Sequence, residues 1–483
     1  MKEAITDIFD VLKGMQETMA SMQDTIDSQH EEICSLNRKL DKANKENKKL
    51  RQRLSKYEKP TKDSGNSSTP PSKENMKAEV VRRTRTLREK SDKPVGGQIG
   101  HEGHTLQKTE RPDAVIDIEA NYCTSCGEPL DNCERILDYV QQVISLPEMK
   151  PVIKELRHYK TICKNCGEVV QSHPKRKRGS NAVVYDSSIK SLVVYLSIVQ
   201  FLPYGRINSL LKDLYSLNIS EGSQKNWIDQ AKRQASPVIE KIKECIMKAS
   251  VVGFDESGCY CNKRLDWAWI AQTVYFTLLF RGSGRAAKEL ESRFGDSLER
   301  MTAVTDRHSA YFAINFLNHQ VCLAHLLREL QYLDELDTKQ TWSKDVADLL
   351  RKAIHERNSN PDAVIETKPW LEKLDDLLKD CRESLGKKFE TLRKGLIKCR
   401  DYIFNFLSNP AIPSDNNGSE RGIRKLKIKI KNSCTFRSDD GADAFLELHS
   451  IIETAKKHDK KPFEAIRALF EGMDSFGMAA IAE

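Results

Sequence analysis

A regular spacing of apolar residues near the N-terminus restricts that part of the chain to one long helix with a partner. Starting at Ile5, apolar side chains recur at alternating intervals of three and four residues over eight heptads. This repeat is typical of a coiled coil and predicts one over residues 1–58. The a positions are Ile5, Leu12, Met19, Ile26, Ile33, Leu40, Asn47 and Leu54, and the d positions are Ile8, Met15, Met22, Gln29, Leu36, Ala43, Leu50 and Tyr57.

Asn47 is the one polar residue among these a positions. A single Asn in an otherwise apolar a seam fixes the register of a parallel two-stranded coil at some cost in stability. We therefore expect a homodimer, or a larger assembly built on it. The alternative is a lone amphipathic helix packed on its own domain, but the neighbouring sequence supplies no apolar core for it.

The cellular context also follows from composition. The N-terminal residues lack a charged-then-apolar signal pattern, and no apolar stretch is long enough to span a bilayer. We expect a cytoplasmic protein without a membrane partner. In a reducing compartment, thirteen cysteines favour metal binding or buried thiols over a disulfide framework.

Positive charge is concentrated in short runs. The 483 residues, enough for about three domains, have a formal net charge of only +8. Basic runs at 80–90, 173–179 and 424–432 are where phosphates of a nucleic acid would be neutralised. The last run includes Lys429 and Lys431. Each run is also compatible with an ordinary solvated face.

Residues 59–112 read as a basic, flexible linker. The stretch KPTKDSGNSSTPPSKENMK is too polar to bury enough surface to fold. The glycines of GGQIGHEGH, at 96–104, suit an extended arm better than a helix.

Two Cys-x-x-Cys pairs mark residues 113–175 as a small zinc-binding ribbon. Cys123 and Cys126 precede two strand-like stretches, at 135–146 and 152–162, and Cys163 and Cys166 follow them. Four thiolates at the ends of an antiparallel pair match the tetrahedral geometry of structural zinc. Cys133 is close enough to be a substitute ligand. Thioredoxin-like redox pairs are the alternative, but the surrounding parallel-sheet unit is missing.

Residues 176–249 are predicted to be helical, with a break at 217–220. Two helices joined by a turn capped at Ser220 could form a helix-turn-helix reader of a DNA groove. The second helix would then expose Gln224, Lys225, Asn226 and Lys232. The alternative is that these helices are only scaffold.

From residue 250 to 440 the pattern changes to strands and helices with acids at particular positions. Three strands, a helix and two further strands, each followed by a helix, predict a mixed sheet. Asp255 ends the first strand and Asp306 the fourth, so the two carboxylates would emerge at one edge if those strands are neighbours. Paired carboxylates repel each other unless a cation lies between them, and magnesium prefers such oxygen ligands.

A third acid, Glu420, lies in the stretch SDNNGSERGIR. A helix capped by Ser414 or Asp415 would place Asn416, Glu420 and Arg424 on one face. That face could hold a cation and a phosphate together, completing a two-metal site with the two aspartates. It could equally be a solvated surface helix whose charges pair with each other.

The ordered set of motifs resembles the transposases of the insertion sequence 66 family. The motifs are the coiled coil, GGQIGHEGH, the CTSC and CKNC knuckles, GFDESG, TDRHSAYF, VCLAHLLREL, SDNNGSERGIRKL and IIETAKKH. The resemblance covers nearly the whole chain. It implies a ribonuclease-H-like fold with Asp255, Asp306 and Glu420 as its catalytic triad, and a helical insertion at about 326–407. Residues 441–483 would form a helical tail. The fold class is therefore multidomain α+β.

The resemblance implies DNA cleavage and strand transfer by two-metal phosphoryl transfer, with Mg²⁺ or Mn²⁺ at the triad and structural Zn²⁺ at the cysteines. Arg421, Arg424 and Lys425 would position phosphates. The partners would be transposon ends and target DNA, with accessory proteins of the same element left open, and the location would be the nucleoid of a bacterium. The rival functions are a regulator that binds DNA without catalysis and a hydrolytic nuclease on the same fold.

The chain departs from the family pattern after the Glu-bearing helix. Where the family commonly has Trp-Leu-Phe, this sequence has Ser433, Cys434 and Thr435. The change affects a packing or DNA contact but leaves the triad intact. Cys322 and His325 resemble a Cys-x-x-His of related transposases, and here we expect a core or hydrogen-bonding role instead of metal binding.

Overall fold

The computed structural model describes residues 2–54, 106–171, 182–337, 340–379 and 386–473. The predicted linker with its Gly/His arm lies largely outside these ranges, as do the basic run at 173–179 and the end of the tail. In the part that is described, no helix combines the length and the apolar character needed to cross a membrane.

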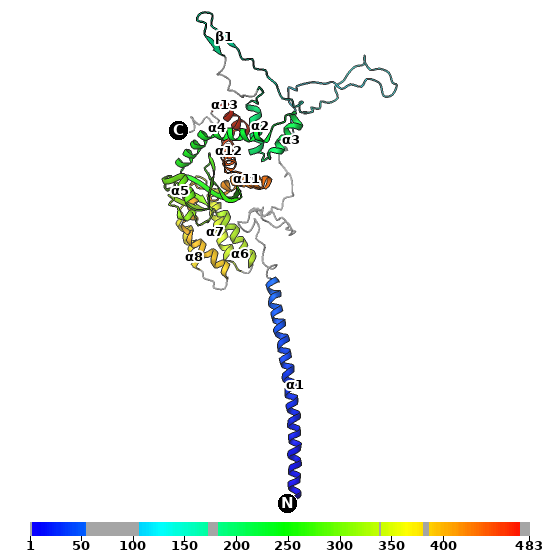
Figure 1. Ribbon diagram of the computed structural model, residues 1–483, viewed down its shortest axis with the longest axis vertical. Coiled ribbons are helices and arrows are strands. Elements are labelled where there is room, and N and C mark those ends of the chain that lie inside the picture. Colours follow the sequence, from blue (N-terminus) through cyan, green and yellow to red (C-terminus); the bar gives the residue numbers. More distant parts are fainter. Residues whose placement is uncertain (1, 55–105, 172–181, 338–339, 380–385, 474–483) are drawn as a thin grey trace. The chain divides into compact units, whose positions relative to one another are not determined.

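The N-terminal helix α1 (Lys2–Leu54) is continuous, as the heptad repeat predicts (Figure 1). Its apolar seam faces outward: Met15, Met19, Met22, Ile26, Ile33, Leu36, Leu40 and Leu50 are each more than half exposed. Apolar side chains in such a row are stable in water only when something covers them.

The segment predicted to be a zinc-binding ribbon, at 113–175, has little regular structure in its described residues. Its only strands among the described residues are β1 (Lys160–Ile162) and β2 (Val169–Gln171), an antiparallel pair. The strand predicted at 135–146 is wrong, and that at 152–162 survives only in its last three residues. Alternation of apolar residues misled the prediction here, because almost all of these side chains, such as Ile136 and Val143, are exposed and have no core to pack on.

The protein is mixed α/β, with a mixed sheet of five strands in the order β5-β4-β3-β6-β7. Strands β3 (Val251–Cys261), β4 (Arg264–Gln272) and β5 (Thr277–Gly282) form the predicted antiparallel meander. Strands β6 (Thr302–Thr305) and β7 (Asn318–Val321) are parallel. Between them, where a helix is predicted, lies a one-turn 3-10 helix at Tyr311–Ala313.

The described residues fall into two compact units. One takes in residues 302–312 and 316–417 together with α1, and the other takes in the rest. In the first, helices follow β7 as predicted: α6 (Leu323–Leu336), α7 (Trp342–Ser359), α8 (Lys368–Lys379), α9 (Lys387–Lys398), η5 (Arg400–Tyr402) and α10 (Asn405–Ser408).

In the second unit the meander has a different cover on each face. Phe294, which ends α5 (Lys288–Phe294), packs edge-to-face on Phe254 and Phe280, and η2 (Gly295–Arg300) follows it. On the opposite face, Arg281 of β5 pairs with Asp443 of α12 (Asp439–Lys457). Hydroxyls of α12 also accept the N–H groups of β5, from Leu279 to Ser450 and from Thr277 to Thr454. This edge strand is therefore satisfied and not open to another chain.

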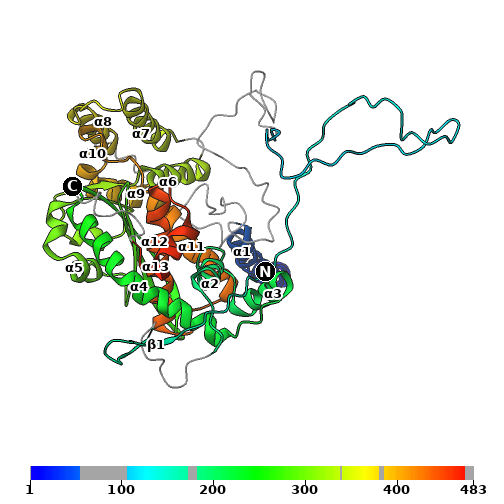
Figure 2. The same ribbon diagram turned by 90° about the horizontal axis from the view of Figure 1, so that it is seen from above.

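Four further helices of this unit form one cluster. They are α2 (Ser187–Ile198), α3 (Tyr204–Tyr215), α4 (Glu221–Lys248) and α13 (Pro462–Glu471), with α12 alongside α4 (Figure 2). As predicted, the chain breaks between α3 and α4, and the Ser220 hydroxyl caps α4. The prediction that Gln224 is exposed is wrong. Its amide is buried and donates to the carbonyl oxygens of Tyr204 and Ile219, which fixes the turn between the two helices.

Candidate active site

Asp255 lies in the middle of β3, not at its end as predicted. The strand continues to Cys261 because Asn262 and Lys263 form a tight turn, with positive φ at both residues, that leads back into β4. Asp255 is opposite Ile270 of β4, so both side chains are on the face that α12 covers. One carboxylate oxygen of Asp255 accepts the N–H of the next residue at 2.9 Å.

Helix α11 (Asn417–Ser433), which carries Glu420, packs closely on β4. A Cβ added at Gly422 would lie 2.4 Å from Cδ1 of Ile270, and one added at Gly418 would lie 2.1 Å from the Gln272 amide. The two glycines are one turn apart on the helix, and the two β4 residues are on one face of the strand. A Cβ at Gly422 would require the buried Ile270 side chain to shift, whereas one at Gly418 would displace only the end of the Gln272 side chain. This close packing brings α11 against the residue that pairs with Asp255.

Asp306 follows β6 directly, as predicted, and its carboxylate accepts the N–H of His308 at 2.8 Å. The Thr305 hydroxyl donates to the carbonyl oxygen of Asp306 and lies 2.8 Å from Nε2 of His319. Burial lowers the pKa of His319 to about 4, so the ring is neutral at pH 7. A buried, uncharged imidazole thus fixes the backbone at Asp306.

Cys322 connects the Asp306 strand to the segment that enters α11. Its N–H donates to the Thr305 carbonyl oxygen, and its thiol accepts the N–H of Asn416 at 3.2 Å. The N–H of Leu323 reaches the Ser414 carbonyl oxygen. Cys322 thus forms hydrogen bonds through both its backbone N–H and its thiol. Of the two predicted caps, Asp415 accepts the N–H of Asn417 at the start of α11.

Glu420 is in the first turn of α11 and is buried, with its side chain 11% exposed. Its carboxylate accepts a charge-assisted hydrogen bond at 2.8 Å from Arg424, one turn later on the helix and 56% exposed. A cation therefore already compensates this buried acid. The predicted pairing of charges along one face is present.

The basic residues after Glu420 have different surroundings. Arg421 and Lys431 are exposed, whereas the ammonium of Lys429 lies over the ring of Phe445, 6.0 Å from its centre. Lys425 donates to Glu453 of α12 at 2.9 Å. These contacts make Arg421 and Lys431 the cations of α11 best placed to meet an external anion.

Glu453 is a buried acid that holds two lysines. Lys425 and Lys456 both donate to one of its oxygens, at 2.9 and 2.8 Å. Burial raises the pKa of Glu453, but attraction to His449 when that ring is protonated, together with the hydrogen bonds from the two lysines, outweighs it and lowers the pKa to about 2. Burial lowers the pKa of His449 to about 4, so this ring is neutral at pH 7. At that pH the two lysines neutralise the charge of Glu453.

The comparison with protein families gives one match. The model of the transposase IS66 family, whose short name includes DDE, matches residues 182–444, more than half of the chain. The chain belongs to the IS66 family of transposases. It is accordingly an enzyme of transposition that acts on and binds DNA, and the family implies use of a divalent metal. No curated protein matches the chain.

The predicted triad of this transposase is divided between the two compact units. Asp306 belongs to the first, and Asp255 and Glu420 belong to the second. The triad stays a prediction. Sequence reasoning missed Thr305, whose hydroxyl contacts the backbone at Asp306, and His319, which contacts that hydroxyl. It also missed Glu453, which pairs with Lys425 of the Glu420 helix. Of these, Thr305 alone has a local signal in the sequence, because it is a polar residue directly before a candidate acid.

The cysteine pairs of the transposase form two similar knuckles. In each, the first cysteine accepts an N–H from the glycine that follows the second, so that Gly127 and Gly167 adopt positive φ. Backbone N–H groups of Ser125 and Cys126 lower the pKa of Cys123, and those of Cys166 and Asn165 lower that of Cys163. Zinc binds the thiolate form that these bonds favour. The described structure does not gather three or more of the four sulfurs within 4.8 Å.

Another group has metal-binding residue types but is already neutralised. Cys261, Asp266 and Asp439 offer ligand atoms within 4.8 Å of one another. Arg264 pairs with both aspartates, and Arg281 pairs with Asp266 at 2.9 Å. This cluster ties the β3–β4 hairpin to the start of α12. Phe436, after the sequence that departs from the family pattern, is buried nearby and donates its N–H to Tyr260.

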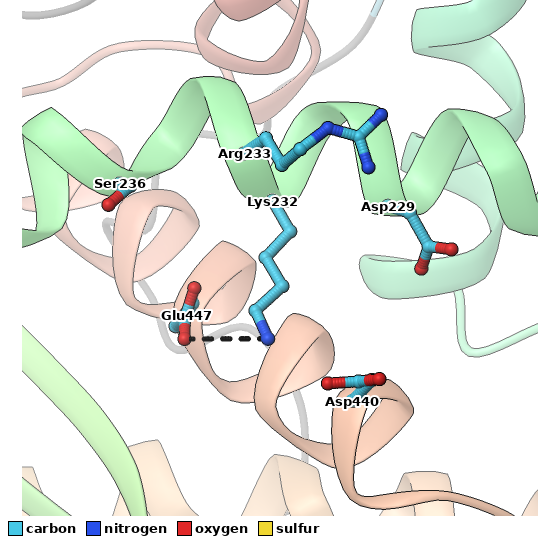
Figure 3. Close-up of a pocket in the computed structure, with 6 residues that line it drawn as sticks. All are labelled: Asp229, Lys232, Arg233, Ser236, Asp440 and Glu447. Carbon is cyan, nitrogen blue, oxygen red and sulfur yellow. Dashed lines mark ion pairs between the residues drawn. The ribbon is translucent and has the colours of Figure 1, made fainter.

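A cleft of about 410 Å³ lies between α4 and α12, and none of the three acids lines it (Figure 3). Its lining consists of Asp229, Lys232, Arg233, Ser236, Asp440 and Glu447. Lys232, predicted to face DNA, instead extends toward Glu447, 3.9 Å away. The lining combines three acidic residues with two basic residues, so it selects neither an anion nor a cation by charge.

Proposed function

We propose that this transposase cuts the ends of its element and joins them to target DNA with Asp255, Asp306 and Glu420 as metal ligands. The attachment of α11 carries the proposal. The segment that leads into α11 is hydrogen-bonded to Cys322, which is also hydrogen-bonded to the residue before Asp306. The glycine face of α11 packs on Ile270, the residue opposite Asp255 in the sheet. The first of these attachments lies within the unit that contains Asp306, and the second within the unit that contains Asp255.

The residues suit two Mg²⁺ or Mn²⁺ ions. Carboxylate oxygens are the ligands that these hard cations prefer. Glu420 is a buried acid whose present cationic partner, Arg424, is more than half exposed and can move away into solvent. When bound, the ions supply a nucleophile at neutral pH and stabilise the entering and leaving oxygens of an in-line displacement.

Two phosphoryl transfers at the same site would complete the reaction. In the first, water attacks a phosphodiester at the transposon end, a P–O bond breaks, and a 3′ hydroxyl is released. In the second, that hydroxyl attacks a phosphodiester of the target, so one bond forms as one breaks and no external energy source is needed. Arg421, Arg424 and Lys431 would hold the DNA backbone beside the acids, with Lys425 fixed by Glu453. Lys429 would contribute least, given its place over Phe445.

The other modules would bring the DNA ends together. The exposed apolar seam of α1 fits a second copy of itself, which makes the transposase a homodimer or larger. The two cysteine knuckles would share one Zn²⁺ and gather the exposed apolar residues between them into a small core, as metal-dependent modules do. We place this ribbon, with the helical region that follows it, at the element ends, and the protein in the bacterial cytoplasm at the nucleoid.

The test is a cleavage and strand-transfer assay with Mg²⁺ on DNA that carries both ends of the element, using the intact protein and Glu420→Gln. The matched control is Glu464→Gln, an acid of α13 that is 64% exposed. We expect the control to cut and join like the intact protein, and Glu420→Gln to bind DNA without cutting it. If all three proteins bind and none cuts, the chain is a DNA-binding regulator. If all three cut and release a 3′ hydroxyl that is never joined, it is a nuclease and Glu420 is not a ligand.

A further inference from the structure

Helix α9 carries an uneven distribution of charge. It has five basic residues and one acid in twelve positions, whereas α8, of the same length, has three lysines and three acids. Phe389, Leu392 and Leu396 of α9 are buried. The opposite face presents Lys387, Lys394 and Lys398, which the spacing of seven and then four residues places in one row. We call these three residues the α9 lysine row.

The other two cations of α9 are engaged within the protein. Lys388 donates to the Tyr332 hydroxyl at 2.6 Å and lies over its ring, and Arg393 forms two hydrogen bonds with Glu390. In the row, Lys394 is 3.5 Å from that same shared carboxylate. Among the described residues, no acid lies within ion-pair distance of Lys387 or Lys398. The row therefore presents positive charge that the described protein hardly neutralises.

The C-terminal end of the row lies beside the loop that carries Asp306. Arg307, the next residue, approaches α9 so closely that a Cβ at Gly395 would lie 2.4 Å from its guanidinium. Arg307 also pairs with Glu329 of α6. Gly395 is adjacent to Lys394 in sequence and one turn before Lys398. A strand of DNA held by the row would thus pass near a proposed metal ligand of the same compact unit.

We propose that the α9 lysine row binds the phosphate backbone of duplex DNA next to the Asp306 loop. The row spans about 16 Å along the helix, a length of duplex that carries about ten phosphate charges. Lysines one or two turns apart, without base-reading side chains between them, suit contact with phosphates and not with base edges. This inference rests on the proposed function. It adds a surface on the helical insertion, which would contact DNA of any sequence.

Acetylation of lysines by an amine-reactive ester, read by mass spectrometry, tests the surface directly. The full-length protein is labelled with and without a 30-base-pair duplex of random sequence. We expect modification of Lys387, Lys394 and Lys398 to fall at least threefold with DNA, while Lys368 and Lys379, the exposed lysines at the two ends of α8, are unchanged. Protection of Lys431 without protection of the row overturns this inference and leaves the proposed function standing. A protein that does not bind the duplex at all overturns both.

The salt dependence of binding gives a second, independent measurement. Each phosphate contact contributes about −0.9 to the slope of log K against log salt concentration. Replacing the row by Gln should make the slope shallower by about 2.7. The matched variant replaces Lys368, Lys373 and Lys379 of α8 by Gln and removes the same charge. Equal slopes for the two triple variants would refute the surface, since net charge alone would then explain the effect.

Discussion

Helices α9 and α11 have similar outward faces but are held in different ways. Each exposes three cations in a row: the α9 lysine row, and Arg421, Arg424 and Lys431 on α11. Each also has a glycine that a neighbouring side chain approaches so closely that an added Cβ would collide with it. At α11 that neighbour is Ile270, a fully buried side chain of the sheet. At α9 it is the guanidinium of Arg307, whose side chain is 19% exposed and able to move.

This difference separates two kinds of contribution to the proposed reaction. Glu420, which we propose as a metal ligand, must be held within a fraction of an ångström, and α11 packs glycine against a buried side chain of the sheet. A surface that neutralises phosphates needs only charge at the right distance, and α9 meets that need with long side chains around a movable arginine. We expect the two helices to differ in stability when their glycines are replaced.

The largest effect should come from Gly422→Ala. The added methyl cannot be accommodated without displacing Ile270 in the core, which we expect to lower the free energy of unfolding by about 1–3 kcal/mol. A shift of α11 moves Glu420, and a misplacement of about 1 Å costs about a hundredfold in rate. Urea unfolding and the cleavage assay measure the two effects. The control is Gly222→Ala in α4, where a Cβ would have nothing nearer than 3.9 Å, and both quantities should stay near those of the parent protein.

Gly395→Ala in α9 should affect activity more than stability. Alanine gains up to about 1 kcal/mol in helix propensity, which offsets the cost of displacing the Arg307 guanidinium. Because Arg307 adjoins Asp306, we expect cleavage to fall about tenfold, with an unfolding free energy within about 1 kcal/mol of the parent. A loss of stability as large as that of Gly422→Ala would show that α9 is held as rigidly as α11.

The ion pair between Glu453 and Lys425 of α11 should make the stability of the fold depend on pH. The pKa of Glu453 is lowered from 4.5 to about 2, so the acid stabilises the fold above pH 4.5 and loses that contribution as the pH falls toward 2. The contribution at neutral pH is of the order of 2–3 kcal/mol. In Glu453→Gln this part of the pH dependence should vanish. Urea midpoints at pH 6, 4 and 3 measure it, and parallel curves for the two proteins would contradict the assignment.

The sequence predicted the strands of the meander and the positions of Asp306 and Glu420 within their elements, because both have local signals. Alternating apolar residues mark β3 to β5, and Asp306 and Glu420 stand where a strand ends and a helix begins. Asp255 was placed wrongly at a strand end because the residues after it, Glu256 to Gly258, look like a turn. Their pairing with Trp267 to Trp269 overrides that local preference. Gln224 was misjudged for the same reason, since only the packing of α3 against α4 makes its amide buried.

The smallest effect should come from Arg424→Ala, which tests whether Arg424 occupies the place of a metal beside Glu420. Ion pairs of this i,i+4 type contribute about 0.3–0.5 kcal/mol, so stability should change little. Removing a competing cation of that strength should lower the Mg²⁺ concentration for half-maximal cleavage about twofold. DNA affinity is measured separately, because Arg424 is also proposed to contact phosphate. Lys431→Ala, which lacks contact with Glu420, should weaken DNA binding to a similar extent without changing the Mg²⁺ requirement. If both variants need more Mg²⁺ than the parent protein, Arg424 supports metal binding instead of competing with it.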